Sequence, residues 1–571
     1  MAAFNSQGAV QEALAFIEDA RLPHPSGPLL SSFVTEALNP TLAAGHVIRT
    51  CHAAGDQYAS LLSLVSDWTY VVESFSQYGS QPPALDASTK TAIAKRDGFK
   101  CCIAGKASHL WDRLDIVPIL PVPSRLANPQ ARIFDMLGAF FTPPYRDWWL
   151  EYIREPDSIS PFENHWLVRA SAAIAFSQGL LRLNRLQPSM IEYEIQPIFV
   201  GNLAKPIDID GSYPLLGDHS RLGTTKVDAR FVGTHARLAP SIRWLDLSRY
   251  ASLNKRIKGP LSSTSTDPAI TSQRPSQTRS VSFLGFLGDL CLATWRMVPA
   301  RARIATYKLL KRMGRRMYGL SSSPDVQRLP FGLFLKCLGD PDALHNEFNA
   351  LRMVRQYTSV PVPRPLDIAS KPTESRNGFY SRDVYILTTR VPGFTLSRSR
   401  EMLSDDDVAD FVAQMQDYLT QIRAISKVVS PEHAICNTLG GPCTDTRIRD
   451  GNPIGPFVDE ASFSQLLRNP DEPSRRGHRI VFTHADLNTR NMLVDQIARP
   501  DGTKSWKLVG IVDWEFSGYY PEYWEYTKSL FEGFRYSQRW QNVMHETFKA
   551  FGDMSKEYEV EKRSWEEGDY I

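Results

Sequence analysis

The stretch RIVFTHADLNTRNMLVD, residues 479–495, decides the fold of the C-terminal part of this chain. The apolar run at 480–483 predicts a strand, the polar residues after it predict a loop, and 492–494 predicts a second strand. The loop holds His484, Asp486 and Asn491 in the pattern H-x-D-x-x-x-x-N. Because this pattern is short, its meaning depends on the sequence around it.

Downstream, the turn signal Pro-Asp-Gly at 500–502 leads into the apolar strand KLVGIVDWE, which ends at Asp513. If 492–495 and 507–512 pair as an antiparallel hairpin, Asn491 lies beside Asp513. Two oxygen-donating side chains there, with Asp486 a few residues upstream, suit an octahedral magnesium ion. Asp486 is then placed to orient an acceptor hydroxyl and accept its proton, as phosphoryl transfer requires.

Upstream, RLPFGLFLKCLG at 328–339 predicts a strand whose apolar residues run into Lys336, and 341–357 predicts a helix. Glu347 falls on the edge of the apolar face of that helix. A carboxylate turned toward a core costs several kcal/mol unless it meets a cation, and Lys336 is the nearest candidate. The apolar face consists of Leu344, Phe348, Leu351 and Val354.

These motifs together resemble the aminoglycoside phosphotransferase and choline kinase-like family, especially its filamentous-fungal members. The resemblance rests on HADLNTRN, GIVDWE and LPFGLFLK with the helical glutamate, and it covers roughly 285–571. Further matching phrases are SVPVPRPLDI (359–368), YILTTRVPG (385–393), ICNTLGGPC (435–443) and YYPEYWEYTK (519–528).

The resemblance implies a two-lobed protein-kinase-like fold that uses ATP and magnesium. By the same carry-over, Lys336 contacts phosphates and pairs with Glu347, Asp486 is the catalytic base, and Asn491 and Asp513 hold magnesium.

It further implies that backbone at Thr389, Arg390 and Val391 meets adenine. One departure concerns the phosphates: no G-x-G-x-x-G loop precedes Lys336, and only Gly319 and Gly332 lie nearby. Phosphate contacts must then come from other backbone.

The N-terminal region resembles HNH nuclease-like domains in KRDGFKCCIAGK (95–106), LDIVPILPVP (114–123) and ENHWLVRASAAIAFSQGLLRL (163–183). That family has histidines where this chain has Asp115 and Ala173, and only Asn164 of its triad persists. Phosphodiester hydrolysis by that fold needs a histidine to activate water, and ligands for a divalent metal. We therefore expect a degenerate HNH-like fold that serves as a binding or scaffold module rather than a nuclease.

A segment rich in Ser, Thr, Pro and Gln at 258–280 predicts a flexible linker, because it has too few large apolar residues to fold. The predicted organisation is α+β throughout: residues 1–255 form the HNH-like domain, 256–284 the disordered linker and 285–571 the kinase-like domain. The two halves could also be separate genes joined in a wrong gene model. The basic stretch at 281–320 indicates either a membrane-surface helix or a helix packed on the kinase-like lobe.

The composition excludes several classes of protein. Among 571 residues, 65 basic and 62 acidic side chains give a net charge of +3, too small to indicate nucleic acid or membrane as a partner of the whole chain. Seven scattered cysteines without a C-x-x-C pair indicate free thiols. Neither a signal peptide nor an apolar run of about 18 residues is found, so a cytoplasmic protein without a membrane span is expected. The oligomeric state stays open.

The predicted function is an ATP- and magnesium-dependent phosphotransferase acting on a hydroxyl of an unidentified small molecule. The alternative is a catalytically idle kinase-fold and HNH-fold protein used for binding or as a scaffold. Glu515, Glu522 and Glu525 would suit a cationic acceptor, but glutamates among tyrosines also fit a solvated or packed helix.

Overall fold

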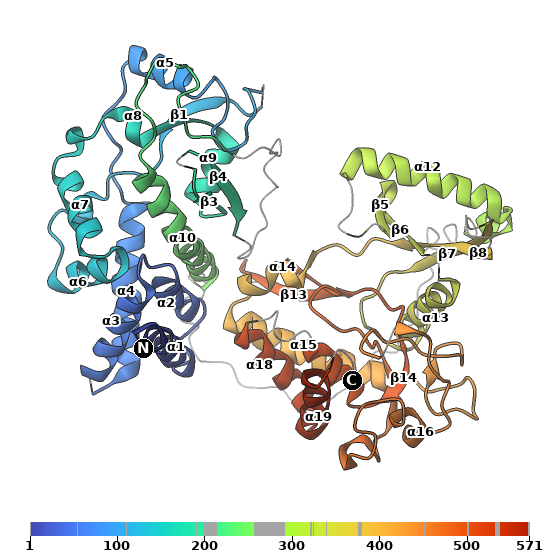
Figure 1. Ribbon diagram of the computed structural model, residues 1–571. Helices are drawn as coiled ribbons and strands as arrows, with labels where there is room; N and C mark the ends of the chain where they lie inside the picture. The colour runs from blue at the N-terminus through green and yellow to red at the C-terminus, as the bar shows by residue number, and fades with distance from the viewer. Residues whose placement is uncertain are drawn as a thin grey trace, which may run out of the picture. The chain divides into compact units, whose positions relative to one another are not determined.

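The computed structural model divides into two compact units, Met1–Ile257 and Lys258–Ile571 (Figure 1). It describes residues 2–571 except 54, 110, 190, 199–213, 256–291, 320–322, 324, 339, 375–379, 449–450, 500–501, 532–536 and 569–570. The predicted linker, 256–284, lies outside the described residues. In the described part, no helix has both the length and the apolar character that crossing a membrane requires.

The N-terminal unit is mainly helical, and its helices surround one core. At the centre of that core, Trp68 contacts the rings of Phe33 and Phe140, and Phe75 packs edge-on against Trp149. The longer helices are α1 (Ala2–Asp19), α2 (Ser26–Thr35), α3 (Pro40–Ala53), α4 (Gln57–Phe75), α5 (Ala87–Arg96), α6 (Ala131–Phe141), α7 (Pro143–Arg154), α9 (Ala170–Ser177) and α10 (Ala229–Lys255).

Two antiparallel strand pairs complete this unit: β1 (Leu114–Pro118) with β2 (His165–Arg169), and β3 (Leu181–Arg185) with β4 (Tyr193–Pro197). Asn164 has a structural role beside β2. Its Nδ2 donates to the Leu120 carbonyl over 2.9 Å, and its Oδ1 accepts from the Leu120 N–H over 3.1 Å. Asp115 is exposed on β1 and Ala173 lies on α9. The resemblance to HNH domains stays a prediction.

The first lobe of the C-terminal unit is an antiparallel sheet in the order β5-β6-β8-β7. The prediction of one strand over 328–339 is wrong in part, because the chain turns at Pro330–Gly332 and makes a hairpin. Phe331 and Gly332 both have positive φ, 63° and 68°. Pro330 cannot donate to a ladder and Gly332 accepts a positive φ readily, so this segment favours a turn. The strands are β5 (Val326–Leu329), β6 (Leu333–Leu338), β7 (Pro365–Glu374) and β8 (Tyr380–Thr389).

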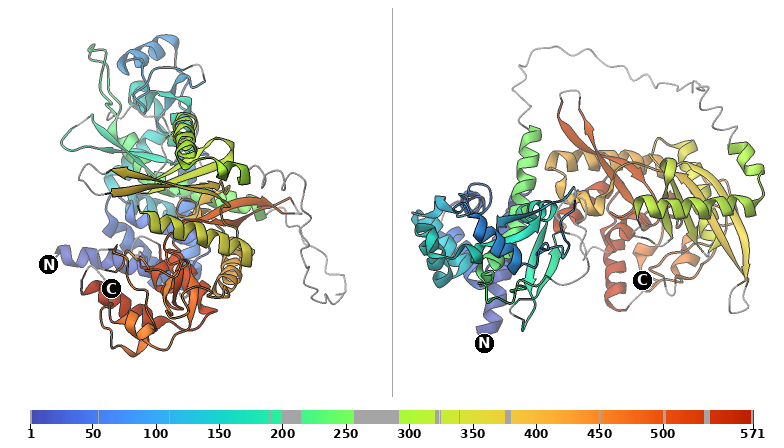
Figure 2. Two further views of the ribbon diagram at one scale, coloured as in Figure 1. Left: turned by 90° about the vertical axis from the view of Figure 1, so that its right-hand side faces the viewer. Right: turned by 90° about the horizontal axis from the view of Figure 1, so that it is seen from above.

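Two helices cover the faces of this sheet, α12 (Ala300–Tyr318) on one and α13 (Pro341–Tyr357) on the other (Figure 2). The bounds of α13 are those predicted. Its N-cap is Asp340, whose carboxylate accepts from the N–H groups of Asp342 and Ala343. On α12, Ile304 and Tyr307 are buried against the sheet. The described part of the basic stretch therefore packs on the kinase-like lobe.

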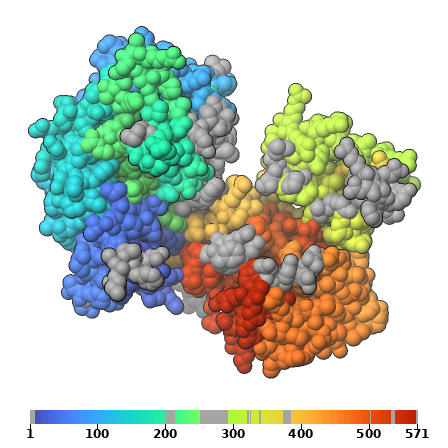
Figure 3. Space-filling view, viewed as in Figure 1, coloured from blue at the N-terminus to red at the C-terminus, as the bar shows by residue number. Residues whose placement is uncertain are grey.

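The second lobe contains the predicted hairpin. Strands β12 (Met492–Ala498) and β13 (Lys504–Ile511) are antiparallel with Met492 opposite Ile511, and β11 (Ile480–Thr483) forms as predicted. In the space-filling view, the unit is hollowed between its yellow-green and orange lobes (Figure 3). Further elements are β9 (Phe394–Thr395), β10 (Cys436–Asn437), β14 (Gly518–Pro521), α14 (Leu396–Ser399), α15 (Asp405–Arg423), α16 (Glu460–Ser464), α17 (Trp524–Leu530), α18 (Gln538–Lys549) and α19 (Ser555–Glu566).

Candidate active site

The loop between β11 and β12 is held in shape by a buried carboxylate. Glu525, on α17, accepts hydrogen bonds from the backbone N–H groups of His484 at 2.7 Å, Ala485 at 3.1 Å and Leu487 at 3.2 Å. Ala485 has a φ of 63°, a conformation that costs a non-glycine residue about 1 kcal/mol or more. Three backbone hydrogen bonds to one side chain stabilise this conformation of the loop, so Glu525 offsets the strain.

His484 connects the loop to the hairpin. Its Nε2 lies 3.0 Å from the Val512 carbonyl, and its Nδ1 accepts from the Asp486 N–H at 3.2 Å. Burial lowers the pKa of His484, which favours the neutral ring. A neutral ring with the proton on Nε2 satisfies both bonds. His484 therefore joins the backbone of Asp486 to the residue that precedes Asp513.

The Asp486 carboxylate is mostly buried and is oriented by Asn491. The Asn491 Nδ2 donates to both Asp486 Oδ2 and the Asp486 carbonyl, each over 2.9 Å. Burial raises the pKa of Asp486 to about 6, while the ammonium of Lys528 opposes the rise and the Asp513 carboxylate adds to it. A carboxyl with this pKa is ionised at neutral pH and can accept a proton during a reaction.

Lys528 supplies the cation nearest to Asp486 among the described contacts. Its Nζ lies 3.9 Å from Asp486 Oδ1, and it is fixed by Asp445 Oδ1 at 2.9 Å and Thr446 Oγ1 at 3.0 Å. Asp445 also pairs with Arg447 at 3.0 Å. Burial would raise the pKa of Asp445, but Arg447 and Lys528 outweigh it and hold that pKa well below its ordinary value. Lys528, held in place by its buried ion pair with Asp445, therefore lies beside the predicted base, Asp486.

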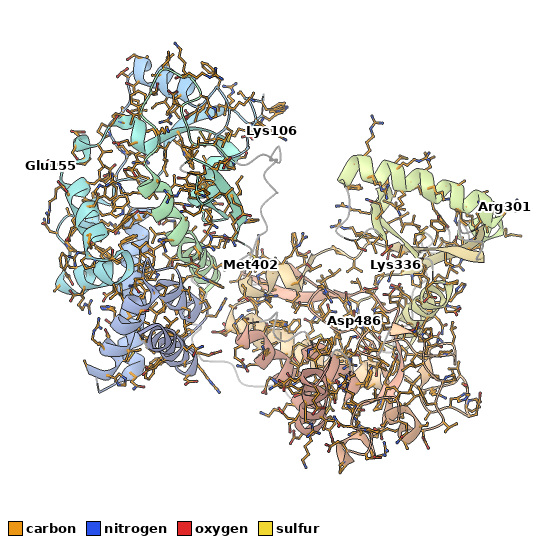
Figure 4. All side chains as sticks on the ribbon, in the orientation of Figure 1. Lys106, Glu155, Arg301, Lys336, Met402 and Asp486 are labelled. Carbon is orange, nitrogen blue, oxygen red and sulfur yellow. The ribbon has the colours of Figure 1, made fainter. Side chains whose placement is uncertain are left out.

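Lys336, on β6, meets three carboxylates. Its Nζ lies 2.9 Å from Glu347 Oε2, 2.5 Å from Asp513 Oδ1 and 2.8 Å from Glu515 Oε2. The predicted pair of Lys336 and Glu347 is confirmed by this distance. The ammonium also donates a hydrogen bond to Asp513 Oδ1. Figure 4 labels Lys336 and Asp486, which come from the two lobes of this unit.

This cluster is short of positive charge. Burial would lower the pKa of Lys336, but the three carboxylates raise it well above its ordinary value. Burial raises the pKa of both Glu347 and Glu515. Ligand oxygens of Glu347, Asp513 and Glu515 lie within 4.8 Å of one another. Three carboxylates clustered around one ammonium leave an excess of negative charge, which fits a divalent cation with oxygen ligands.

Asn491 and Asp513 are brought together in the backbone, as the hairpin argument requires. The Val512 N–H donates to the Asn491 carbonyl over 2.9 Å. Their side chains, however, have different partners: Asn491 bonds to Asp486, and Asp513 to Lys336. That Asn491 and Asp513 share one magnesium ion stays a prediction.

The predicted adenine contacts lie on the chain that leaves β8. The N–H of Thr389 donates to the Arg364 carbonyl over 3.0 Å, and the N–H of Arg390 donates to the Gly332 carbonyl over 2.7 Å. Both donors are therefore engaged within the protein. Val391 packs on Gly510 of β13, where a Cβ would come within 2.5 Å of its Cγ1. Of the predicted residues, Val391 is the one whose N–H has no partner among the described hydrogen bonds.

Asn346 was not singled out from the sequence, yet it fastens α13 to the second lobe. Its Nδ2 donates to the carbonyls of Glu515 and Ser517, both over 2.8 Å, and its Oδ1 accepts from the Thr438 N–H over 2.9 Å. The neighbouring Glu347 is thereby held against the Lys336 cluster. Only its place next to Glu347 on the helix could have suggested this role.

The three glutamates considered for a cationic acceptor all have protein partners. Glu515 pairs with Lys336, Glu522 pairs with Arg479 at 2.7 Å, and Glu525 holds the loop. Every residue of α17 is buried. The packed-helix interpretation therefore fits Glu525, whereas Glu515 and Glu522 lie outside α17 and are paired with cations.

Comparison with known protein families gives a match for the part of the chain that contains this site. Residues 337–560, less than half of the chain and all within the C-terminal unit, match the family model described as the phosphotransferase enzyme family (APH). That family implies a protein-kinase-like fold for this part of the chain. No curated protein matches the chain.

Proposed function

We propose that the C-terminal unit is an ATP- and magnesium-dependent phosphotransferase that acts on a hydroxyl of a small molecule. The observation that carries the proposal is the convergence of Lys336, Glu347 and Asp513 beside the Asp486 loop, in a segment that matches a phosphotransferase family. Phosphoryl transfer needs charge neutralisation on the phosphates and an oriented nucleophile, and these residue types supply both.

In this proposal Lys336 binds phosphate oxygens of ATP, and Glu347 holds the lysine in place. Asp513 and Asn491, with Glu515 close to the same point, would hold magnesium, which when bound neutralises charge on the phosphates. Asp486 orients the acceptor hydroxyl and takes its proton, and Asn491 fixes the carboxylate for that task. The backbone near Val391 meets the adenine ring.

Asp486→Asn tests the assignment of the base. Phosphoryl transfer is expected to fall at least about a hundredfold while nucleotide binding persists, since a general base commonly contributes that much. Thermal shift with ATP and magnesium measures binding, and an ATP-consumption screen over candidate alcohols measures turnover. Unchanged turnover would remove Asp486 from the mechanism. Binding without turnover of any alcohol by the wild-type chain would favour the idle, binding-only alternative.

For the N-terminal unit we propose a binding or scaffold role on a degenerate HNH-like fold. The support is that Asn164 forms structural bonds to Leu120, and that Asp115 and Ala173 stand where the resembled family has histidines.

A further inference from the structure

A cavity of about 480 Å³ lies in the N-terminal unit, apart from the residues assigned to phosphotransfer. It is lined by the β3–β4 hairpin, by one face of α10, by residues that follow α2, by the end of α6 and by Tyr145 on α7. Its volume falls within the range of small-molecule sites, roughly 300–1,000 Å³.

The lining of the cavity has an excess of positive charge. Arg182, Arg185, Arg230 and Arg237 all contribute to it, and Glu36 is the one acidic side chain among its lining residues. Asp228, outside the lining, pairs with Arg230. Arg182 pairs with Glu36 at 2.7 Å, and the Glu163 carboxylate, in addition to the hydrogen bond with Asp228, also raises the pKa of Arg230. Burial lowers the pKa of Arg237, as expected of a cation that is incompletely compensated.

Two of these guanidinium groups are held in place along part of their edges only. Arg182 donates to Glu36 Oε2 and to Gln196 Oε1, each over 2.7 Å. Arg237 donates through Nη1 to the carbonyls of Glu36 and Ala37 over 3.0 and 3.1 Å. In the described part of the chain, these bonds leave the Nη2 groups of both arginines without a hydrogen-bond acceptor. An anion would find donors that are already oriented, which lowers the cost of binding.

The floor of the cavity is made of small residues. Ala229, Gly233 and Ala236 lie on the α10 face that lines it. A glycine inside a helix costs about 1 kcal/mol relative to alanine. Packing does not require this glycine, because a Cβ at Gly233 would meet no atom within 4 Å. The space above it is therefore open to a ligand, and Tyr145 beside it offers an aromatic surface.

We propose that this cavity binds a small organic anion, a carboxylate or a phosphate ester carried on a flat apolar group. The guanidinium groups would take the anionic end, and the floor of α10 with Tyr145 would take the apolar part. Carboxylates and phosphates share the geometry that arginine recognises, so the experiment distinguishes them.

The test uses the full chain and isothermal titration with 1-naphthyl phosphate, 1-naphthoate and neutral 1-naphthol. Parallel titrations of Asp486→Asn, which alters the proposed kinase site, are expected to match the wild type; a changed affinity would place the probes in that site instead. At least one anion is expected to bind at one per chain and at least about tenfold more tightly than naphthol. The tighter anion identifies the preferred chemistry.

Two variants separate a ligand site from a structural feature. Arg182→Gln removes charge and is expected to weaken binding at least about tenfold, which corresponds to about 1.4 kcal/mol. Gly233→Leu fills the floor, favours the helix and is expected to abolish binding. Arg154→Gln, an exposed position at the end of α7, is the matched control and should bind like the wild type. The proposal is overturned if naphthol binds as tightly as both anions, if neither anion binds, or if both cavity variants bind normally.

Discussion

Replacing Lys528 by methionine is expected to move the pH dependence of turnover, because this ammonium lies 3.9 Å from the proposed base. The Asp486 carboxyl, with a pKa of about 6, must be ionised to accept a proton. Turnover of the wild type should therefore fall as the pH drops through about 6. Lys528 lowers the pKa of Asp486, so its removal raises that pKa and moves the acid limb to higher pH.

The size of the shift follows from the distance. Two unit charges 3.9 Å apart interact by about 4 kcal/mol at an effective dielectric constant of about 20, and by about 1 kcal/mol in water. One pKa unit corresponds to about 1.4 kcal/mol. Asp486 is partly exposed, so its environment lies between these limits, and an upward shift of about one to three units is expected. At pH 6 the variant should be nearly inactive, whereas above pH 9 it should recover much of its turnover.

The assay is ADP release over pH 5 to 10, with the best alcohol from the screen or with water as acceptor. Lys549→Met, at an exposed position, is the control and should keep the wild-type limb. Asp445→Asn combined with Lys528→Met removes a charge of each sign. Because the Asp445 carboxylate raises the pKa of Asp486, the double variant should shift less than Lys528→Met. An active Lys528→Met protein with an unmoved or lowered acid limb would refute the reasoning.

Two further predictions concern the loop and the N-terminal unit. Glu525→Gln replaces the acceptor of three N–H bonds by an amide, and we expect it to lower the free energy of unfolding by about 2 kcal/mol or more. Urea titration measures this change, and Glu432→Gln, at an exposed position, is the control. An unchanged urea midpoint would contradict the role given to Glu525. Residues 1–255, purified alone, are expected not to nick plasmid DNA with magnesium, manganese or zinc, because Asp115 and Ala173 stand where HNH nuclease-like domains have histidines. Metal-dependent cleavage that persists after contaminating nucleases are removed would contradict this expectation.

The apolar periodicity and the turn signals of the sequence predicted two parts of this site, the β12–β13 hairpin and the pair of Lys336 and Glu347, because both form between segments that are close in sequence. The hairpin that brings Asn491 to Val512 follows from two apolar runs around a turn signal. The pair of Lys336 and Glu347 follows from a strand, a helix and the cost of burying a carboxylate. For the hairpin, the turn signal determines which residues face each other. For the ion pair, helical periodicity places Glu347 near the core, and the cost of burying its carboxylate indicates a cationic partner.

The residues that sequence reasoning missed act over longer separations. Glu525 follows the loop it holds by about 40 positions, and in sequence it is one glutamate among several in an acidic and aromatic stretch. Lys528 reaches Asp486 only because α17 packs behind the loop. Such contacts depend on how elements pack, which periodicity does not specify. The turn at Phe331 was missed for another reason: the apolar residues on both sides continue the strand pattern through it.

The form of that turn also bears on how phosphate could be bound without a glycine-rich loop. Pro330 has no N–H, so the tip of the β5–β6 hairpin offers at most the N–H groups of Phe331 and Gly332. The Gly332 carbonyl is already bonded to the Arg390 N–H, which ties the tip to the chain leaving β8. Backbone donors for phosphate are therefore scarce at this position, and more of the task falls to the Lys336 ammonium. An ammonium shared among three carboxylates can meet a phosphate only if some of that negative charge is neutralised, which is what a divalent cation beside Asp513 and Glu515 would do.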